Sequence, residues 1–160
     1  MKIELSPIGI IHTPYKDPKG VPIQPVFSKD VVGTVEVLPE YKKGLSDLDG
    51  FSHIILLYFF HKSTGYKLLC RPFLDNQERG LFATRAPRRP NPIGLSVVEL
   101  LKIEDHVMTV GSPDILDGTP LLDIKPYVPE FDCRDTVKTG WYEKAGNRTQ
   151  TFADERFLDP

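Results

Sequence analysis

The stretch His-Ile-Ile-Leu-Leu-Tyr-Phe-Phe-His, at residues 53–61, decides the fold of this 160-residue chain. Its central residues, 54–60, form the longest apolar run of the sequence and are rich in side chains that favour strands. The run predicts a strand that is buried on both faces. It is far shorter than the roughly 20 residues that a helix needs to cross a bilayer. The stretch therefore indicates the centre of a β-sheet and no association with a membrane.

Other strands are expected on both sides of this one. The segments whose apolar residues alternate or are rich in valine lie at residues 3–12, 31–38, 66–72, 80–85, 95–103, 107–112 and 121–127. The pair at 95–103 and 107–112 could form a hairpin. Helical structure is expected only in short pieces, at residues 40–49 and near 153–157. Fifteen prolines and twelve glycines are scattered along the chain, which favours short strands and tight turns over a helix bundle.

These features predict a mainly β fold, a small β-barrel with short helices and not a Rossmann fold. We expect one domain over residues 1–160, with the barrel core at about residues 3–130 and a C-terminal tail at 131–160. The N-terminus lacks the apolar segment of a signal peptide, so the cytoplasm is the expected location. Cys70 and Cys133 match no zinc-binding spacing, and we expect reduced thiols and no metal site.

Charge is distributed unevenly along the chain, although the formal net charge is only -2. Residues 62–89 contain seven lysines and arginines against two acidic residues, whereas residues 99–135 contain nine acidic residues against three basic ones. A basic segment within an acidic protein is typical of a local phosphate-binding face. An ordinary solvated surface would give the same pattern, and the sequence alone leaves both interpretations open.

The most distinctive segment is Phe-Ala-Thr-Arg-Ala-Pro-Arg-Arg-Pro-Asn-Pro-Ile-Gly-Leu-Ser, at residues 82–96. Its three prolines fix the backbone before any ligand arrives, so three arginines are held at low entropic cost. Arginine side chains suit carboxylates and phosphates. Gly94 would leave room for a ligand against the backbone. A rigid surface turn with solvated arginines explains the segment equally well.

A second segment, Asp-Ile-Leu-Asp-Gly-Thr-Pro-Leu-Leu-Asp-Ile-Lys-Pro-Tyr at residues 114–127, contains an Asp-Gly turn. The amides of this turn could meet a ligand. Asp123, Lys125 and Tyr127 follow at a spacing of two, which places them on one face of a strand. They could handle a proton or bind a ligand, or they could form a solvent face with an ion pair. The chain contains no glycine-rich nucleotide loop and no hydrolase signature of the common kinds.

The segments at 82–96 and 116–127, together with residues 8–16 and 50–62, resemble the TsaA/TrmO family of S-adenosylmethionine-dependent tRNA methyltransferases. The resemblance covers roughly residues 3–130 and implies a small β-barrel. It also implies a homodimer with the cofactor S-adenosyl-L-methionine near the subunit interface. The implied reaction is methylation of N6 of threonylcarbamoyladenosine, next to the anticodon in tRNA. Bacterial members carry arginine where this chain has Ile23, and they continue into an additional C-terminal domain.

The resemblance also implies a set of site residues. The implied cofactor-binding residues are Pro22, Ile23, Gln24, His61, Lys62, Arg85, Leu95, Leu116, Asp117, Gly118 and Thr119. The candidate catalytic residues are Asp117, Asp123, Lys125 and Tyr127. Arg88, Arg89 and Asn91 are candidates for contact with the anticodon loop of tRNA.

Most of the rate in such a transfer comes from holding an activated donor in line with the acceptor, so no metal is required. The acylated N6 is a weak nucleophile, and a group that accepts its proton would help. Three alternatives remain open from the sequence: a non-catalytic RNA-binding or regulatory module that retains the barrel, a methyltransferase for another small substrate, and a hydrolase that uses Asp123 and His61.

Overall fold

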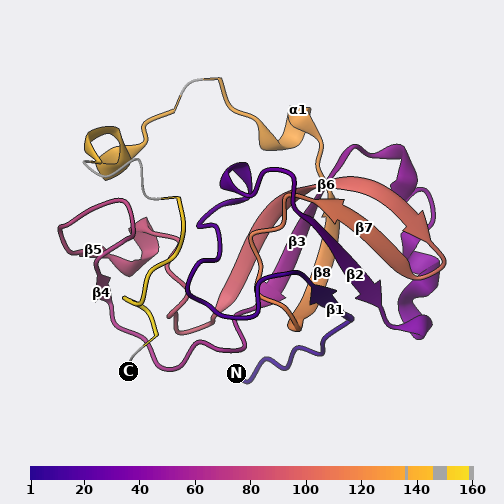
Figure 1. The fold of residues 1–160 in the computed structure, drawn as a ribbon, viewed down its shortest axis with the longest axis horizontal. Coiled ribbons are helices and arrows are strands. Elements are labelled where there is room, and N and C mark those ends of the chain that lie inside the picture. Colours follow the sequence, from indigo (N-terminus) through magenta and orange to yellow (C-terminus); the bar gives the residue numbers. More distant parts are fainter. Residues whose placement is uncertain (136, 146–150, 159–160) are drawn as a thin grey trace.

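The computed structural model describes residues 1–135, 137–145 and 151–158. Its centre is a closed barrel of six strands, in which every neighbouring pair is antiparallel (Figure 1). In barrel order the strands are β1 Gly9–His12, β2 Val32–Val37, β7 Val107–Gly111, β6 Ile93–Glu104, β3 His53–Phe59 and β8 Thr119–Pro126, and β8 pairs with β1. The predicted mainly β barrel is confirmed.

The apolar stretch becomes β3, which pairs with β6 on one side and with β8 on the other. Ile54, Leu56 and Tyr58 are buried inside the barrel, whereas Ile55 and Leu57 are half-buried on its outer face. The prediction that both faces are buried is therefore wrong. In a closed barrel alternate side chains point outward, and here the outward-pointing ones are only partly covered.

The hairpin prediction is confirmed by β6 and β7, which are joined by a tight turn at Asp105 with φ of 58°. Of the predicted strand at residues 3–12, only β1 forms. The predicted strands at 66–72 and 80–85 shrink to the two-residue pair β4 Leu69–Cys70 and β5 Arg79–Gly80. Residues 81–83 form a 3-10 turn in place of the predicted strand, because local apolar patterns do not distinguish a short strand from a turn.

Helical structure is limited to short pieces among the described residues. The predicted helix at 40–49 consists of two 3-10 segments, Pro39–Leu45 and Leu48–Gly50. The other pieces are Pro25–Phe27, Leu81–Ala83, α1 Pro129–Asp132 and Gly140–Lys144. The predicted helical turn near 153–157 is wrong, since the chain there forms an extended bridge and then a hydrogen-bonded turn. None of the helices in the described part of the chain has the length and hydropathy of a membrane span.

The hydrophobic core fills the barrel and is built from inward-facing residues of all six strands. Outside it, the loop after β1, the connection between β3 and β6 and the end of the C-terminal tail gather on one side of the barrel, to the left in Figure 1, whereas the connection between β2 and β3 lies on the right. Residues 79–92, the loop after β1 and the tail therefore lie near one another although they are distant in sequence. This arrangement gives the barrel one elaborated side where a ligand site can form.

Candidate functional site

A cavity of about 380 Å³, the main cavity, lies where five segments of the chain meet. These segments are the loop at residues 21–24, the end of β3 at 60–63, the loop at 84–95, the turn at 114–119 and the tail at 153–158. Apolar side chains and a few polar groups line it, which is the composition of a small-molecule site. The two segments singled out by sequence thus share one cavity.

The structure brings together most of the residues that the family resemblance assigned to the cofactor. Nine of those eleven residues line the main cavity: Pro22, Ile23, Gln24, His61, Lys62, Arg85, Leu95, Leu116 and Thr119. Asp117 and Gly118 belong to the same turn but are not among the lining residues. Their assignment as cofactor ligands stays a prediction.

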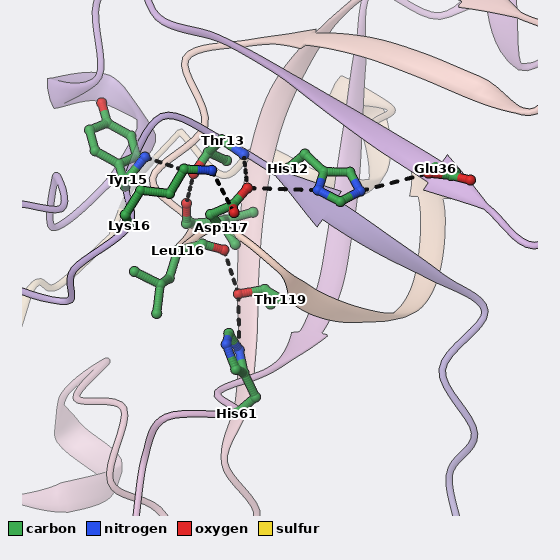
Figure 2. Close-up of polar contacts among 10 residues, drawn as sticks. His12, Thr13, Tyr15, Lys16, Glu36, His61, Leu116, Asp117 and Thr119 are labelled. Atoms are coloured by element: carbon green, nitrogen blue, oxygen red, sulfur yellow. Dashed lines mark hydrogen bonds and ion pairs between the residues drawn. The ribbon is translucent and has the colours of Figure 1, made fainter.

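Asp117 fixes the turn at 114–119 to the first strand (Figure 2). Its carboxylate accepts a hydrogen bond from the Thr13 amide at 3.0 Å and forms an ion pair with Lys16 at 2.6 Å. The Lys16 ammonium holds the pKa of this carboxyl below its usual value. The next residue, Gly118, has φ of 73° and donates its amide hydrogen to the Ile11 carbonyl at 2.9 Å. These contacts make the turn a rigid wall of the site.

His61 lies at the edge of this turn with its ring directed at Thr119 (Figure 2). Thr119 Oγ1 donates its one hydrogen to the Leu116 carbonyl at 2.7 Å and lies 3.3 Å from His61 Nδ1. His61 Nδ1 must therefore be the donor in the second contact, which leaves Nε2 without a proton and able to accept one. Burial, and next the charge of Lys62, lower the pKa of His61, so the ring is neutral at neutral pH.

A buried chain of three polar side chains borders the main cavity, and the sequence-based prediction missed it. Ser96 Oγ donates to the Asp114 carboxylate at 2.5 Å, and Tyr58 donates its hydroxyl hydrogen to Ser96 Oγ at 3.0 Å. Burial raises the pKa of Asp114 to about 6 and raises the pKa of Tyr58 as well. Gly94 opposite Tyr58 is required, because a Cβ atom there would lie 2.2 Å from the tyrosine ring. The ring takes up the space over Gly94 that the sequence had suggested for a ligand.

The predicted catalytic row at the end of the barrel lies outside the lining of the main cavity. Lys125 forms an ion pair with Asp123 at 2.7 Å, so these two side chains do share a face of β8. Tyr127 follows the end of the strand, and its hydroxyl lies 3.0 Å from Cys133 Sγ. Asp123, Lys125 and Tyr127 are thus held by local contacts, and their catalytic role stays a prediction.

The candidate RNA-binding arginines stabilise the proline-rich loop. Arg88 Nε donates to the Thr64 carbonyl at 2.9 Å, and Arg89 donates to the Thr84 carbonyl at 3.0 Å. Asn91 closes the turn into β6 through its carbonyl, which accepts from the Ile93 amide at 2.8 Å. The acceptors of Arg89 are neutral carbonyl oxygens, which leave its guanidinium charge in place.

The C-terminal tail completes the main cavity. Ile23 donates its amide hydrogen to the Thr151 carbonyl at 3.0 Å, and Ala153 donates to the Val21 carbonyl at 2.7 Å. Beyond this pairing, Phe157 packs edge-to-face on Phe73 with ring centroids 5.0 Å apart. Asp154, Phe157 and Leu158 line the cavity. The weak sequence pattern of the tail had given no sign of this role.

Among the residues that the structure describes, no group of three or more His, Cys, Asp or Glu side chains could hold a metal ion. The polar groups of the main cavity are instead two guanidinium groups, an imidazole, an ammonium, an amide and carboxylates, mixed with hydroxyls. Such a set can bind an organic ligand that has both charged and apolar parts.

Comparisons with known proteins relate this fold and cavity to one family. The sequence model of one protein family, the tRNA-methyltransferase O N-terminal domain, matches residues 10–133. A probable S-adenosyl-L-methionine-binding protein of Pyrococcus abyssi is 54% identical over 93% of this chain and 81% of its own length. The tRNA (adenine(37)-N6)-methyltransferase of Escherichia coli is 39% identical over 79% of this chain.

Among solved structures, a crystal structure of TrmO from Pseudomonas aeruginosa matches with a TM-score of 0.74 and 38% identity, over 88% of this chain. The matched regions are 58% of the Escherichia coli protein and 62% of the crystallised one, so the chain spans less than two thirds of these relatives. The family resemblance and the barrel predicted from sequence are both confirmed. This chain belongs to the tRNA-methyltransferase O family.

Proposed function

We propose that this chain is an S-adenosylmethionine-dependent methyltransferase that modifies N6 of threonylcarbamoyladenosine next to the anticodon in tRNA. The observation that carries the proposal is the main cavity, in which residues from distant segments of the sequence meet in one lining. Its volume of about 380 Å³ lies in the range of small-molecule sites. The relatives named as S-adenosylmethionine-binding proteins and as tRNA methyltransferases support the cofactor and the substrate.

The cavity also fits the cofactor chemically. Ser63 lines the cavity, and its buried Oγ has no hydrogen-bond partner among the described residues, which leaves it available to a polar ligand that reaches it. Asp114 offers a carboxylate to a donor that carries positive charge, and Arg85 offers a guanidinium to the carboxylate of an amino-acid end. The apolar walls would enclose the adenine. Ser63, Asp114 and Arg85 would hold the polar parts of the ligand.

S-adenosylmethionine supplies an activated methyl group whose bond to sulfur breaks as the bond to the acceptor nitrogen forms. The chain contributes position, because the rigid turn at 114–119 and the proline-rich loop fix two walls before a ligand arrives. His61 Nε2 is available to accept a hydrogen bond or a proton inside the cavity. We assign it this role because its ring is neutral at neutral pH.

The proposal is tested by incubating the protein with methyl-labelled S-adenosylmethionine and tRNA that carries threonylcarbamoyladenosine. We expect label in that nucleoside, and none when the same tRNA lacks the threonylcarbamoyl group. Calorimetry with S-adenosylmethionine is run in parallel. Cofactor binding without transfer to either tRNA would reject the stated substrate and favour a non-catalytic module. Transfer to the free modified nucleoside, but not to tRNA, would favour a small-molecule methyltransferase.

We also propose that the protein works as a homodimer in the cytoplasm, with the cofactor near the subunit interface. Leu95 lines the main cavity yet remains 46% exposed, and a second subunit could cover such an apolar side chain at the rim. Sedimentation of the purified protein with and without S-adenosylmethionine tests this. A monomer under both conditions would contradict the proposed dimer.

A further inference from the structure

A second hollow of about 630 Å³, the aromatic groove, adjoins the main cavity. The rings that line it are those of Phe27, Phe73, Phe82, Trp141, Tyr142 and Phe157. The two hollows share the lining residues Ile23, Gln24, Phe73, Thr84, Arg85 and Phe157. At this shared wall the Arg85 guanidinium donates to the Gln24 side-chain oxygen at 2.7 Å. Arg85 and Gln24 thus meet through their side chains, which can adjust more easily than backbone.

Two aromatic rings of the groove, those of Phe82 and Tyr142, are exposed, and Trp141 is half-buried. Phe82 is 74% exposed, and the Arg89 guanidinium lies 5.7 Å from its ring centroid. Trp141 donates its indole hydrogen to the Ala83 carbonyl at 2.7 Å, while the Arg79 guanidinium lies 5.8 Å from its ring. Large apolar side chains that stay exposed in a hollow are typical of a binding surface. These rings are oriented before a ligand arrives, which lowers the entropic cost of binding.

Cationic side chains border the groove: Arg85 is one of its lining residues, and the Arg89 guanidinium lies beside the ring of the lining residue Phe82. Arg79 is paired with Asp75 at 2.6 Å, but Arg85 and Arg89 form no ion pair within the described residues. Their hydrogen bonds go to neutral amide and carbonyl oxygens, which do not cancel their charge. Flat aromatic surfaces next to arginines whose hydrogen bonds go to neutral oxygens match a ligand with stacked bases and phosphates. A purely apolar ligand would form no ionic contact with these arginines.

The position of the groove narrows the choice of ligand further. In the proposed function the acceptor nitrogen must come within bonding reach of the donor methyl group. The acceptor site must then adjoin the main cavity, as the aromatic groove does along the lining residues that the two hollows share. We propose that the aromatic groove binds the acceptor nucleotide, an unpaired purine nucleotide of RNA whose base lies against Phe82 and Trp141. This inference rests on the proposed function.

The tryptophan content of the chain allows a direct test, because Trp141 is its single tryptophan and lies in the groove. The full chain, saturated with S-adenosylhomocysteine, is titrated with an anticodon stem-loop RNA that carries threonylcarbamoyladenosine. Binding is followed in parallel by anisotropy of a label at the RNA end. We expect saturable quenching of tryptophan fluorescence with the same midpoint as the anisotropy change, since a stacked base perturbs the indole.

RNA binding without any change in tryptophan fluorescence would overturn the acceptor groove and leave the proposed function intact. The absence of RNA binding by anisotropy would instead reject the proposed tRNA substrate, and the groove assignment with it. Calorimetry with S-adenosylmethionine identifies a protein that has failed to fold. The two hypotheses therefore fail in different readouts.

A second experiment compares two phenylalanines of similar exposure. Phe82 in the groove is 74% exposed and Phe131, which is not among the groove residues, is 72% exposed. We expect Phe82→Ala to raise the KM for tRNA about tenfold or more, with an unchanged dissociation constant for S-adenosylmethionine. Phe82→Tyr should restore the KM. Equal KM values for Phe82→Ala and Phe131→Ala would overturn the proposal.

Discussion

At the residue scale, Asp114 is a proposed binding group whose burial lowers the free energy of unfolding when its carboxyl is ionised. Its ordinary pKa is 3.8, and burial raises the pKa to about 6, so between these values the folded state binds more protons than the unfolded state. Stability therefore falls as pH rises from about 4 to 6, by up to about 3 kcal/mol. We predict that Asp114→Asn raises the free energy of unfolding at about pH 7.5 by about 1–2 kcal/mol and weakens binding of S-adenosylmethionine.

Urea unfolding at about pH 4 and pH 7.5 checks the sign, since the gain should nearly vanish at the lower pH. The groups that face Asp114 are the hydroxyls of Ser96 and Tyr58 and the Arg85 guanidinium. His61 is present in both the variant and the wild type, so any effect of its protonation on stability cancels when the two proteins are compared at the same pH. Asp49→Asn, at an exposed carboxyl, is the control and should change little. A less stable Asp114→Asn protein with normal cofactor affinity would contradict this prediction.

At the scale of the elements, the pairing of β3 with β6 places Tyr58 beside Ser96 and so positions the three hydrogen-bonded side chains that border the main cavity. Gly94 sits opposite Tyr58 in the register, and a Cβ atom added at Gly94 would lie 2.2 Å from Tyr58 Cε2. We predict that Gly94→Ala lowers the free energy of unfolding by about 1–3 kcal/mol, because the ring or the strand must move. Urea unfolding measures the loss. Gly44→Ala is the matched control, since no atom lies within 4 Å of its added Cβ, and equal losses would contradict the argument.

The same elements show which features of the fold and the site can be predicted from the sequence. The turn at 114–119 was predictable because Asp-Gly chemistry is local, and its Gly118 indeed has φ of 73°. The contact of Tyr58 with Ser96 could not be predicted, since it depends on the register between two strands that are separated in sequence by residues 60–92. Asp123 and Lys125 were correctly placed on one face, but alternation cannot tell whether that face meets a cavity.

At the scale of the whole molecule, the barrel closes without the C-terminal tail, whereas the main cavity needs the tail for part of its lining. All six barrel strands end by Pro126, whereas Asp154, Phe157 and Leu158 form part of the cavity lining. We predict that a chain ending at residue 135 keeps the barrel but binds S-adenosylmethionine about tenfold or more weakly, because an apolar wall is lost. Circular dichroism follows the barrel, and calorimetry follows the affinity.

A single substitution in the full chain distinguishes the contribution of the Phe157 ring to the cavity wall from that of the rest of the tail. Phe157→Ala removes the ring that packs on Phe73 but keeps the backbone pairing of Ala153 with Val21. If the ring closes the cavity, this variant should lose most of the affinity that truncation removes, at an almost unchanged unfolding midpoint. If the tail only steadies the loop at 21–24, the variant should bind normally and truncation alone should weaken binding. Normal binding by both proteins would show that the cofactor site is complete within the barrel and its loops.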